Sequence, residues 1–572
     1  MPGRRARPGY GQKRRRIRLR SRSPPITVGH RPGNEHPGSY CMQDIANIAC
    51  AVYRHSVERP EAPALVFQGH TTRYADLARA AARLAHGLQT AAVWPTHRSG
   101  PARVGVLGSR SRDALTAMLG ICWAGATYVP LGVKLPQDRM LAILAQCELD
   151  ALVVAQDAIQ LLTPQLLQAC PALLIFQGDA PASSPPPERP GQRILHASAL
   201  PAVEPAAPAA MGPQDPAYII FTSGTTGVPK GVMVSVASVR HYAASIARTL
   251  SLRADDRALE TCELSFDFSV HNMFATWEAG AALYLLPATQ VMNAVKFART
   301  NALTVWNSVP SLAGMLAQLK TLAPDSLPSL RLTVFGGEQL PESTVQAWHL
   351  AAPHSAIVNL YGPTEATVFC MIQREPFVVT EGRGVVAIGQ VLPGCTAAVV
   401  DDEGQALPHG QAGELAIGGV QLALGYLNAP DLTAQRFPQH GGTRWYRTGD
   451  LAVCDAHGVF HCLGRIDNQV KIMGYRVELE EIEAHLRAAS GVELVAAVAW
   501  PVADGIAKGS VGFVGVSAIQ PVDPAAVITR MKQRLPAYMV PSRIVAMEAL
   551  PLNSSGKVDR RALLARLQDG AV

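Results

Sequence analysis

The segment with the clearest chemical potential is a loop that follows a short apolar run at residues 218–221. The loop supplies hydroxyls, glycines and one lysine, in the order Thr222, Ser223, Gly224, Thr225, Thr226, Gly227 and Lys230. Glycines let the backbone approach a phosphate closely, while hydroxyl and N–H groups donate to its oxygens and a lysine adds positive charge. The loop is not a Walker A motif, because Val228 and Pro229 separate the last glycine from the lysine. It predicts a phosphate-binding loop, with an ordinary Ser/Gly-rich turn as the alternative.

Charged residues stand in three other short motifs. Glu365 follows Tyr-Gly-Pro-Thr, Asp450 follows Thr-Gly, and Lys557 follows a glycine close to the C-terminus. Taken one at a time, such residues often belong to ordinary surface turns.

The first half of the chain alternates between helical and strand-like segments. Helices are predicted at 44–57, 75–92 and 113–123, and short apolar runs predict strands at 104–107, 128–131 and 151–154. This alternation is typical of an α/β fold with a largely parallel sheet. Residues 178–190 and 201–216 are rich in Pro, Ala and Ser and are predicted surface connections, and a second α/β stretch is predicted from Tyr218 to about Leu360.

The last third of the chain has a different pattern. Residues 387–461 contain short strand-like runs separated by glycines, which predicts a small barrel or a distorted sheet. Beyond Gly464 a compact unit of about a hundred residues is expected. Its predicted elements are helices at 479–489 and 524–535 and strands near 493–500 and 511–517.

The phosphate loop and eight other motifs together resemble the acyl-adenylate-forming superfamily, which includes nonribosomal-peptide adenylation domains, acyl-CoA synthetases and luciferases. The motifs occur in family order: TRYADL at 72–77, WAGATYVPL at 123–131, FDFS at 266–269, NLYGPTEAT at 359–367, GELAIGG at 413–419, YRTGDL at 446–451, GRIDNQVKIMGYR at 464–476 and NSSGKVDR at 553–560. The resemblance covers about residues 44 to 563. The chain departs from the family pattern at Gly132 and Val236, neither of which belongs to the core chemistry.

The resemblance implies an α/β fold in two parts. A large N-terminal adenylate-forming body, with two α/β subdomains and a small β-barrel-like subdomain, is expected over residues 42–466. A mobile α+β C-terminal domain is expected over 467–572, with Asp467 at the hinge. Residues 1–41 are expected to be a disordered basic tail.

The resemblance also implies ATP and Mg²⁺ as cofactors and assigns the residues that would hold them. Glu365 corresponds to the magnesium ligand, and Thr364 to a contact with the α-phosphate. Asp450 corresponds to the carboxylate that binds both ribose hydroxyls, with Arg465 as its cationic neighbour. Lys557 would bond the substrate carboxylate and bridging oxygen in the first half-reaction. The adenine and phosphate side of the site is completed by the phosphate loop together with Gly336, Gly337, Glu338, Asn359, Tyr361 and Gly362.

Asp267 in the FDFS motif points to an α-amino acid substrate. Amino-acid-activating members of the superfamily place an aspartate here for the substrate ammonium, and a buried carboxylate needs such a charged partner. The remaining pocket positions are Phe268, His271, Asn307, Val334, Gly336, Leu360, Val368 and Phe369. The pattern is similar to that of threonine-activating members, with serine, proline, valine and alanine as rivals. A strand-end aspartate bonded to backbone is the alternative role for Asp267.

Composition limits the other classes of function. The 572 residues are 48% hydrophobic and 17% charged, which allows a sizeable core and excludes wholesale disorder. The net charge of +7 arises in residues 1–32, which hold eleven Lys and Arg and no acid, while the rest holds 40 basic and 44 acidic residues. A nucleic-acid partner is therefore not expected, since it would rest on this tail alone. No uninterrupted apolar run of eighteen residues predicts a membrane span, and ten scattered cysteines fit reduced thiols in a cytoplasmic enzyme.

The expected partner is a separate phosphopantetheinylated carrier protein that accepts the activated amino acid in nonribosomal peptide synthesis. Neither a condensation motif before the body nor a carrier segment after it is found in the sequence, which favours a free-standing enzyme. Arg476, Arg487, Lys532 and Arg534 are candidates for contact with an acidic carrier. The alternative is an acyl-CoA synthetase or a D-alanine–carrier protein ligase of the same superfamily.

Overall fold

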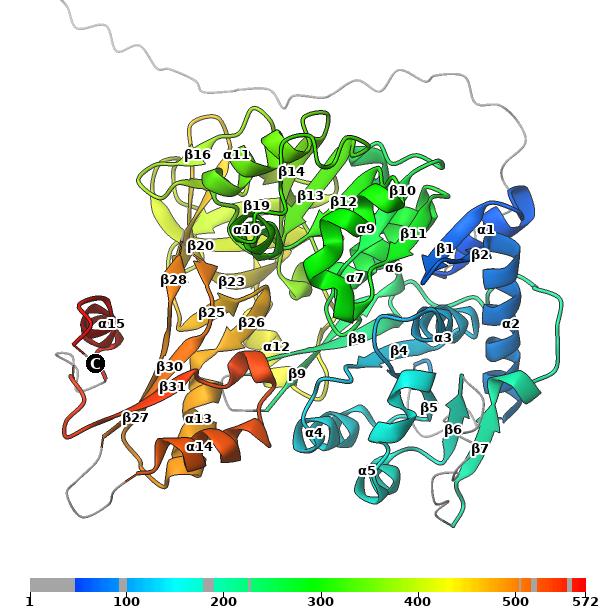
Figure 1. Cartoon of the computed structure of the whole chain (residues 1–572), viewed down its shortest axis with the longest axis horizontal. Coiled ribbons are helices and arrows are strands. Elements are labelled where there is room, and N and C mark those ends of the chain that lie inside the picture. The colour runs from blue at the N-terminus through cyan, green and yellow to red at the C-terminus, as the bar shows by residue number, and fades with distance from the viewer. Residues whose placement is uncertain are drawn as a thin grey trace, which may run out of the picture. The chain divides into compact units, whose positions relative to one another are not determined.

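The computed structural model describes residues 47–91, 100–177, 190–224, 228–503, 506–515, 522–552 and 558–571. The expected tail at 1–41 lies outside the described residues, as do Thr225, Thr226, Gly227 and Lys557. The stretch Asp44–Val572 forms one compact unit, built from mixed α/β elements as predicted (Figure 1).

The first large sheet has eight strands in the order β21-β9-β8-β4-β3-β5-β6-β7. Strands β3 to β8 run parallel, and β9 and β21 add an antiparallel edge. The bounds are β3 Arg103–Leu107, β4 Thr127–Leu131, β5 Ala151–Val154, β6 Leu173–Phe176, β7 Arg193–His196, β8 Pro216–Thr222, β9 Lys230–Ser235 and β21 Gly425–Tyr426. The predicted strands at 104–107, 128–131 and 151–154 are confirmed as β3, β4 and β5.

The second large sheet has nine strands in the order β18-β15-β14-β13-β12-β10-β11-β1-β2. Its six central strands are parallel, and β2, β15 and β18 are antiparallel. The bounds are β1 Pro63–Phe67, β2 His70–Arg73, β10 Arg257–Glu260, β11 Ala282–Leu285, β12 Val305–Ser308, β13 Leu332–Gly336, β14 Ala356–Tyr361, β15 Met371–Arg374 and β18 Gln390–Val391.

The two sheets exchange strands along the chain, which the sequence did not predict. The expected second α/β stretch was to begin at Tyr218, yet β8 and β9 belong to the first sheet. Conversely, β1 and β2 come from the first 73 residues and pair at the edge of the second sheet, beside β11 (Figure 1). Each sheet therefore needs both halves of the body to be complete.

Helices cover these sheets through apolar faces. In α2 the predicted positions Leu77, Ala81, Leu84 and Leu88 are all at most 2% exposed, and α2 packs on α3, where Gly120 lets Leu84 approach the backbone. Ser111 caps α3, because its Oγ accepts a hydrogen bond from the Ala114 N–H. The bounds are α1 Cys50–Glu58, α2 Tyr74–Ala91, α3 Arg112–Trp123, α4 Gln137–Cys147, α5 Pro164–Ala169, α6 Val236–Thr249, α7 Phe268–Val270, α8 Thr276–Glu278, α9 Ala294–Thr300, α10 Pro310–Gln318, α11 Glu342–Ala351 and α12 Pro430–Arg436. A π-helical turn, His271–Ala275, joins α7 to α8.

An antiparallel sheet of five strands occupies the region where a small barrel or distorted sheet was expected. Strands β19, β20, β23 and β22 follow one another, and β24 pairs with β23. The bounds are β19 Cys395–Val400, β20 Ala412–Gly419, β22 Gln439–His440, β23 Thr443–Cys454 and β24 Phe460–Arg465, with a separate ribbon of β16 Val379–Thr380 and β17 Val385–Val386. Within the described residues the pairing path does not return to β19, so this sheet is open.

After β24 the strands pair only among themselves in the described part of the chain. One sheet has the order β26-β25-β29-β28 and the other β27-β30-β31. The bounds are β25 Gln469–Ile472, β26 Tyr475–Glu478, β27 Val495–Ala499, β28 Val502–Ala503, β29 Ile506–Ala507, β30 Ser510–Gly515, β31 Arg543–Met547, α13 Leu479–Ser490, α14 Pro524–Lys532 and α15 Arg560–Gln568. The helices and strands predicted for this region are confirmed as α13, α14, β27 and β30.

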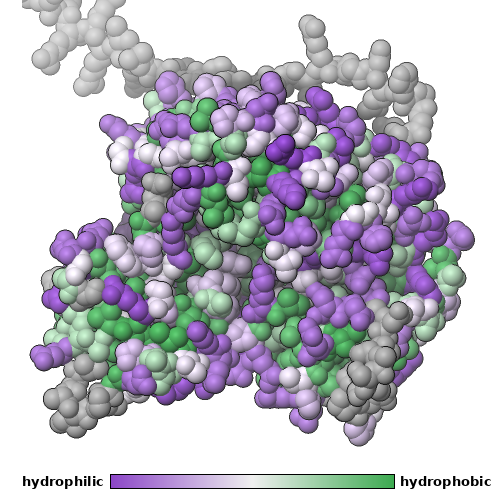
Figure 2. Space-filling model, viewed as in Figure 1, coloured by the Kyte–Doolittle hydropathy of each residue, from purple (hydrophilic) through white to green (hydrophobic). Residues whose placement is uncertain are grey.

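The surface agrees with the hydropathy of the sequence. Hydrophilic residues are spread over the face drawn in Figure 2, with smaller hydrophobic groups between them. Among the described residues, no helix has the length and apolar character that crossing a bilayer requires.

Tyr74 provides a test of the link between the two halves of the body. It is fully buried at the start of α2, and its hydroxyl donates a 2.7 Å hydrogen bond to the Ala281 carbonyl next to β11. Tyr74→Phe leaves that carbonyl unpaired, so we expect the free energy of unfolding to fall by about 1–2 kcal/mol in urea denaturation. Tyr53→Phe is the matched control, since within the described residues its hydroxyl has no recorded partner. Equal effects of the two variants would contradict the role given to the Tyr74 hydroxyl.

Candidate functional site

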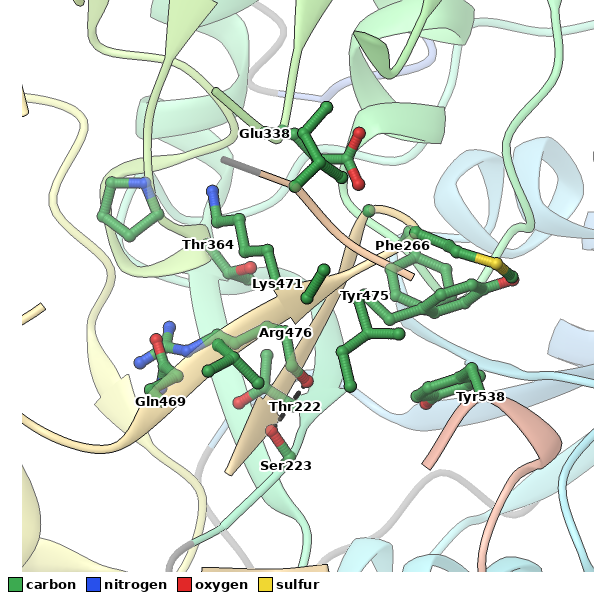
Figure 3. A pocket seen from close by; sticks show the side chains of 18 of the residues that line it. Thr222, Ser223, Phe266, Glu338, Thr364, Gln469, Lys471, Tyr475, Arg476 and Tyr538 are labelled. Carbon is green, nitrogen blue, oxygen red and sulfur yellow. Dashed lines mark hydrogen bonds between the residues drawn. The ribbon is translucent and has the colours of Figure 1, made fainter. Parts of the chain in front are cut away.

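A cavity of about 1010 Å³ lies where loops at the carboxyl ends of β8, β13 and β14 face the β25–β26 hairpin. Carboxyl ends of parallel strands are where ligands bind in open α/β sheets. Figure 3 shows Lys471 and Thr364 in one part of the cavity and Phe266, Tyr475 and Tyr538 gathered in another.

Most of the predicted nucleotide-site residues meet at this cavity, although they are spread over almost 250 positions of the chain. The predicted residues that line it are Thr222, Ser223, Asp267, Gly337, Glu338, Asn359, Leu360, Tyr361, Gly362, Thr364, Asp450, Arg465 and Asp467. Four predicted residues do not line the cavity but lie beside residues that do. Gly224, Gly336 and Glu365 are each next in the chain to a lining residue, and Lys230 pairs with Thr222 across β8 and β9. The predicted substrate residues Phe268, His271, Asn307, Val334, Val368 and Phe369 do not line it either, and all six are at most 5% exposed.

The described part of the phosphate loop is bonded to the segment from β26 to the start of α13. The Ser223 hydroxyl donates to the Arg476 carbonyl at 2.8 Å (Figure 3), and the Gly224 N–H donates to Glu481 Oε2 at 3.2 Å. Lys230 Nζ lies 3.4 Å from Glu478 Oε1. The Gly224 N–H and the Lys230 ammonium are therefore satisfied by carboxylates, groups with the same charge as the phosphate oxygens predicted to bind there.

Glu365 is fully buried and forms an ion pair with Arg476 across this interface. Arg476 Nη1 lies 2.8 Å from Glu365 Oε2, and the Tyr426 hydroxyl donates to Oε1 at 2.8 Å. Burial alone would raise the pKa of the Glu365 carboxyl, but Arg476 and then Lys230 outweigh it and lower that pKa to about 2. A guanidinium therefore lies against the carboxylate that was predicted to hold a divalent cation, and that carboxylate stays ionised.

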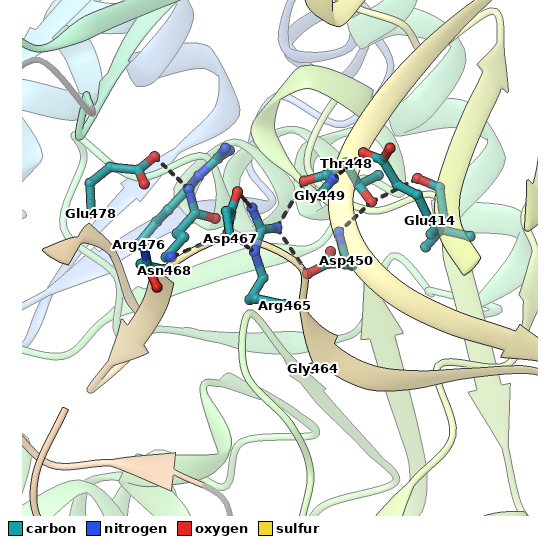
Figure 4. A network of polar contacts seen from close by, with 12 residues as sticks. Glu414, Thr448, Gly449, Asp450, Gly464, Arg465, Asp467, Asn468, Arg476 and Glu478 are labelled. Carbon is teal, nitrogen blue, oxygen red and sulfur yellow. Dashed lines mark hydrogen bonds and ion pairs between the residues drawn. The ribbon is translucent and has the colours of Figure 1, made fainter. Parts of the chain in front are cut away.

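Asp450, Arg465 and Asp467 form a chain of charged contacts at the other end of the cavity (Figure 4). Arg465 donates to Asp450 Oδ1 at 2.9 Å and holds both oxygens of Asp467, at 2.8 and 2.6 Å. The Tyr361 hydroxyl donates to the other oxygen of Asp450. Gly449, at φ +74°, allows this geometry, because a Cβ there would come within 2.7 Å of Arg465 Nη2. Asp450 thus faces the cavity with both oxygens already bonded, and the predicted ribose and hinge carboxylates share one arginine.

Asp267 lines the cavity from the loop before α7, and its pKa is perturbed. Burial raises the pKa of its carboxyl to about 6, against a smaller opposing effect of a side-chain hydrogen bond with Thr364. The two Asp267 and Thr364 side chains, predicted separately to hold the substrate ammonium and the α-phosphate, are therefore in contact. An ammonium group that bound beside Asp267 would restore its charged form.

The structure adds residues that the sequence reasoning did not single out. Lys471 on β25 lines the cavity, and burial lowers its pKa, although the Asp450 carboxylate acts in the opposite direction. Tyr475 stacks on Tyr538 with ring centroids 3.8 Å apart and packs edge-on against Phe266 at 4.7 Å. The sequence did contain a signal for Lys471: it stands between Val470 and Ile472 in a strand, and a charge within an apolar run often marks a functional site.

Arg476, a candidate for contact with an acidic partner, is paired here with Glu365 and lines the cavity, with its side chain 18% exposed. Arg487 and Arg534 keep side chains 41% and 57% exposed, and Lys532 is exposed, so these three remain available for such a contact.

The sequence matches a known protein family over most of its length. Residues 52–427 match the family described as AMP-binding enzyme, and residues 481–557 match the AMP-binding enzyme C-terminal domain. Delta-poly-L-ornithine synthetase of Acinetobacter baumannii is 32% identical over 92% of this chain, and tyrocidine synthase 3 of Brevibacillus parabrevis is 35% identical over 89%. The chain spans only 37% and 7% of the lengths of these two relatives.

The chain is also similar in structure to solved adenylation domains over most of its length. The Vibrio cholerae adenylation domain AlmE, crystallised with glycyl-adenosine-5'-phosphate, has a TM-score of 0.82 and 32% identity, covering 94% of this chain and all of that one. PA1221, described as an NRPS protein containing adenylation and PCP domains, has a TM-score of 0.73 and 25% identity, covering 92% of this chain and 85% of that one.

The Glu365–Arg476 pair can be tested without an activity assay. Arg476→Met leaves Glu365 as a buried carboxylate without its guanidinium, and we expect a loss of about 3 kcal/mol of stability. If Glu365 holds Mg²⁺, millimolar Mg²⁺ should raise the melting temperature of this variant more than that of the wild type, because no guanidinium has to be displaced. The Glu365→Gln, Arg476→Met double variant is the control and should not respond to Mg²⁺. The same response in all three proteins would refute metal binding at Glu365.

Proposed function

The chain belongs to the AMP-binding enzyme family, and on that premise we propose that it activates an α-amino acid with ATP. In this reaction an oxygen of the amino-acid carboxylate attacks the α-phosphorus, the bond to the bridging oxygen breaks, and pyrophosphate leaves. The product is the aminoacyl-adenylate. The single observation that supports the amino-acid substrate is Asp267, a carboxylate on the cavity wall in contact with Thr364.

The contact between Asp267 and Thr364 would set the reaction geometry. Asp267 would bind the α-ammonium, and the neighbouring Thr364 hydroxyl would bind the α-phosphate. The substrate carboxylate, one carbon away from its ammonium, is thereby directed to the phosphorus. Most of the rate gain then comes from positioning two anions and from neutralising their charge.

Nucleotide binding would use the groups that now pair across the cavity. Glu365 would hold Mg²⁺, which would neutralise phosphate charge when bound; its ionised state and its present cationic partner fit that role. Asp450 would take the ribose hydroxyls, with Arg465 fixing its orientation. The phosphate loop would take the phosphates, with Gly336, Gly337 and Glu338 beside adenine and Tyr361 stacked on it.

Two arrangements of the C-terminal part would serve the two half-reactions. In the arrangement described, Arg476, Glu478 and Glu481 are bonded to the groups that would bind MgATP. Residues 467–572 would therefore have to move away from 42–466 before ATP binds. Asp467 would act as the hinge, because its bond with Arg465 lies where the chain leaves β24. Lys557 would then enter the cavity and bond the substrate carboxylate.

The acceptor of the activated amino acid would be the phosphopantetheine thiol of a carrier protein. Support comes from PA1221, whose structure contains adenylation and PCP domains. The substrate expected from the pocket pattern is threonine, whereas AlmE was solved with a glycyl adenylate. Amino-acid-dependent exchange of labelled pyrophosphate into ATP tests the reaction, and turnover with coenzyme A without a carrier protein would favour an acyl-CoA synthetase instead.

The pKa of Asp267 predicts a pH dependence for amino-acid binding. Because this pKa is about 6, the carboxylate is charged above pH 6 and becomes neutral as the pH falls below it. We expect kcat/KM for the amino acid to fall by up to about tenfold per pH unit below 6. Asp267→Asn should have a low kcat/KM without this inflection, and an unchanged profile in the variant would assign the inflection to another group.

The role of Lys557 predicts a separation of the two half-reactions. Lys557→Ala should abolish adenylate formation, while thioester formation from a preformed adenylate should be much less affected. Single-turnover measurements of each step check this expectation. Lys532→Ala, which removes an exposed lysine of the C-terminal part that does not line the cavity, is the control and should leave adenylate formation intact. Equal loss of both steps in Lys557→Ala would contradict the proposed role.

A further inference from the structure

Three aromatic rings pack against one another where the side-chain pocket of the substrate was expected. The centroids of Phe268 and Phe369 are 5.0 Å apart, those of His271 and Phe369 5.6 Å, and those of Phe268 and His271 5.7 Å. Their planes meet at 66° to 85°, the edge-to-face arrangement in which aromatic rings attract. None of the three side chains lines the cavity of about 1010 Å³, which therefore does not open onto their rings.

The Phe369 ring covers the end of β13 at Gly336. The end of β13 is Gly336, and a Cβ added there would lie 2.6 Å from Phe369 Cζ. The ring therefore rests directly on the glycine backbone, in the volume that a substrate side chain would otherwise use. Of the predicted pocket residues, only Asp267 and Leu360 reach the cavity.

A buried hydrogen bond from Tyr242 on α6 to His271 holds the ring cluster in place. The Tyr242 hydroxyl lies 2.6 Å from His271 Nδ1, and both residues are at most 2% exposed. Burial lowers the pKa of His271 to about 3, so the ring is neutral at physiological pH and its Nδ1 can accept this hydrogen bond. His271 also begins the π-helical turn that joins α7 to α8. Moving the cluster would thus break a buried hydrogen bond as well as ring contacts.

We propose that this ring cluster makes the enzyme selective for glycine, with Phe369 as the specificity-determining residue. The inference rests on the proposed function, because it places the substrate ammonium at Asp267. On this proposal a hydrogen in place of a side chain would be accommodated beside Asp267, whereas a larger group would meet Phe369 or Phe268. The proposal replaces threonine, expected from residue types alone, with a substrate that has no side chain.

The test is pyrophosphate exchange with glycine, alanine, serine, threonine and valine. Forcing one methyl group into a packed site should lower kcat/KM for alanine by about tenfold, and threonine should be lower by about a hundredfold or more. Phe369→Ala should open the pocket, raise kcat/KM for threonine and valine by about tenfold, and reduce the preference for glycine.

Phe335→Ala is the matched control, because Phe335 precedes Gly336 on β13 but packs against Trp348 in a different hydrophobic cluster. It removes the same type of side chain close to Gly336 and should keep the glycine preference. A wild-type preference for threonine or any larger amino acid overturns the inference, as does an unchanged ranking in folded Phe369→Ala. If the variant fails to fold, the wild-type ranking decides. Exchange with no amino acid at all would instead overturn the proposed function.

Discussion

The ion pair between Glu365 and Arg476 is the interaction on which the arrangement of this site depends. A fully buried carboxylate is strongly unfavourable without a cation nearby, and here the cation comes from the hairpin that follows β24. The cost of leaving Glu365 alone means that some cation must always lie beside it. Arg476 satisfies that requirement here, and the proposed divalent metal would satisfy it in another arrangement.

The same logic extends to the phosphate loop. Gly224 and Lys230 donate to carboxylates, those of Glu481 and Glu478. Glu481 is itself paired with the buried Arg139 of α4, which ties this contact to the first sheet. On the proposed function, MgATP would replace anion with anion and cation with cation, so that no buried charge would be left unpaired.

Two kinds of side chain lie near the proposed reaction centre: polar groups that can change partners and closely packed aromatic rings. Asp267 and Thr364 are polar groups whose contacts a ligand can change. Because the pKa of Asp267 is raised, an ammonium group bound beside it would stabilise the ionised carboxylate. Phe268, His271 and Phe369 are packed rings anchored by Tyr242. On the two proposals, selectivity and binding energy would therefore come from different residues, although both sets lie in the segments that follow β10 and β14.

The sequence alone located many of the helices and strands and indicated the chemistry. Local periodicity located β3, β4, β5, α2 and α13, because apolar spacing depends only on neighbouring residues. Short motifs identified Glu365, Asp450 and Asp267, because each motif places a reactive group on a local turn. Tertiary structure alone decided which strands share a sheet, since β1 pairs with β11 across about 220 positions. It also decided that Arg476 faces Glu365 and that Phe369 covers Gly336: such contacts depend on the summed packing of distant segments, which no local pattern encodes.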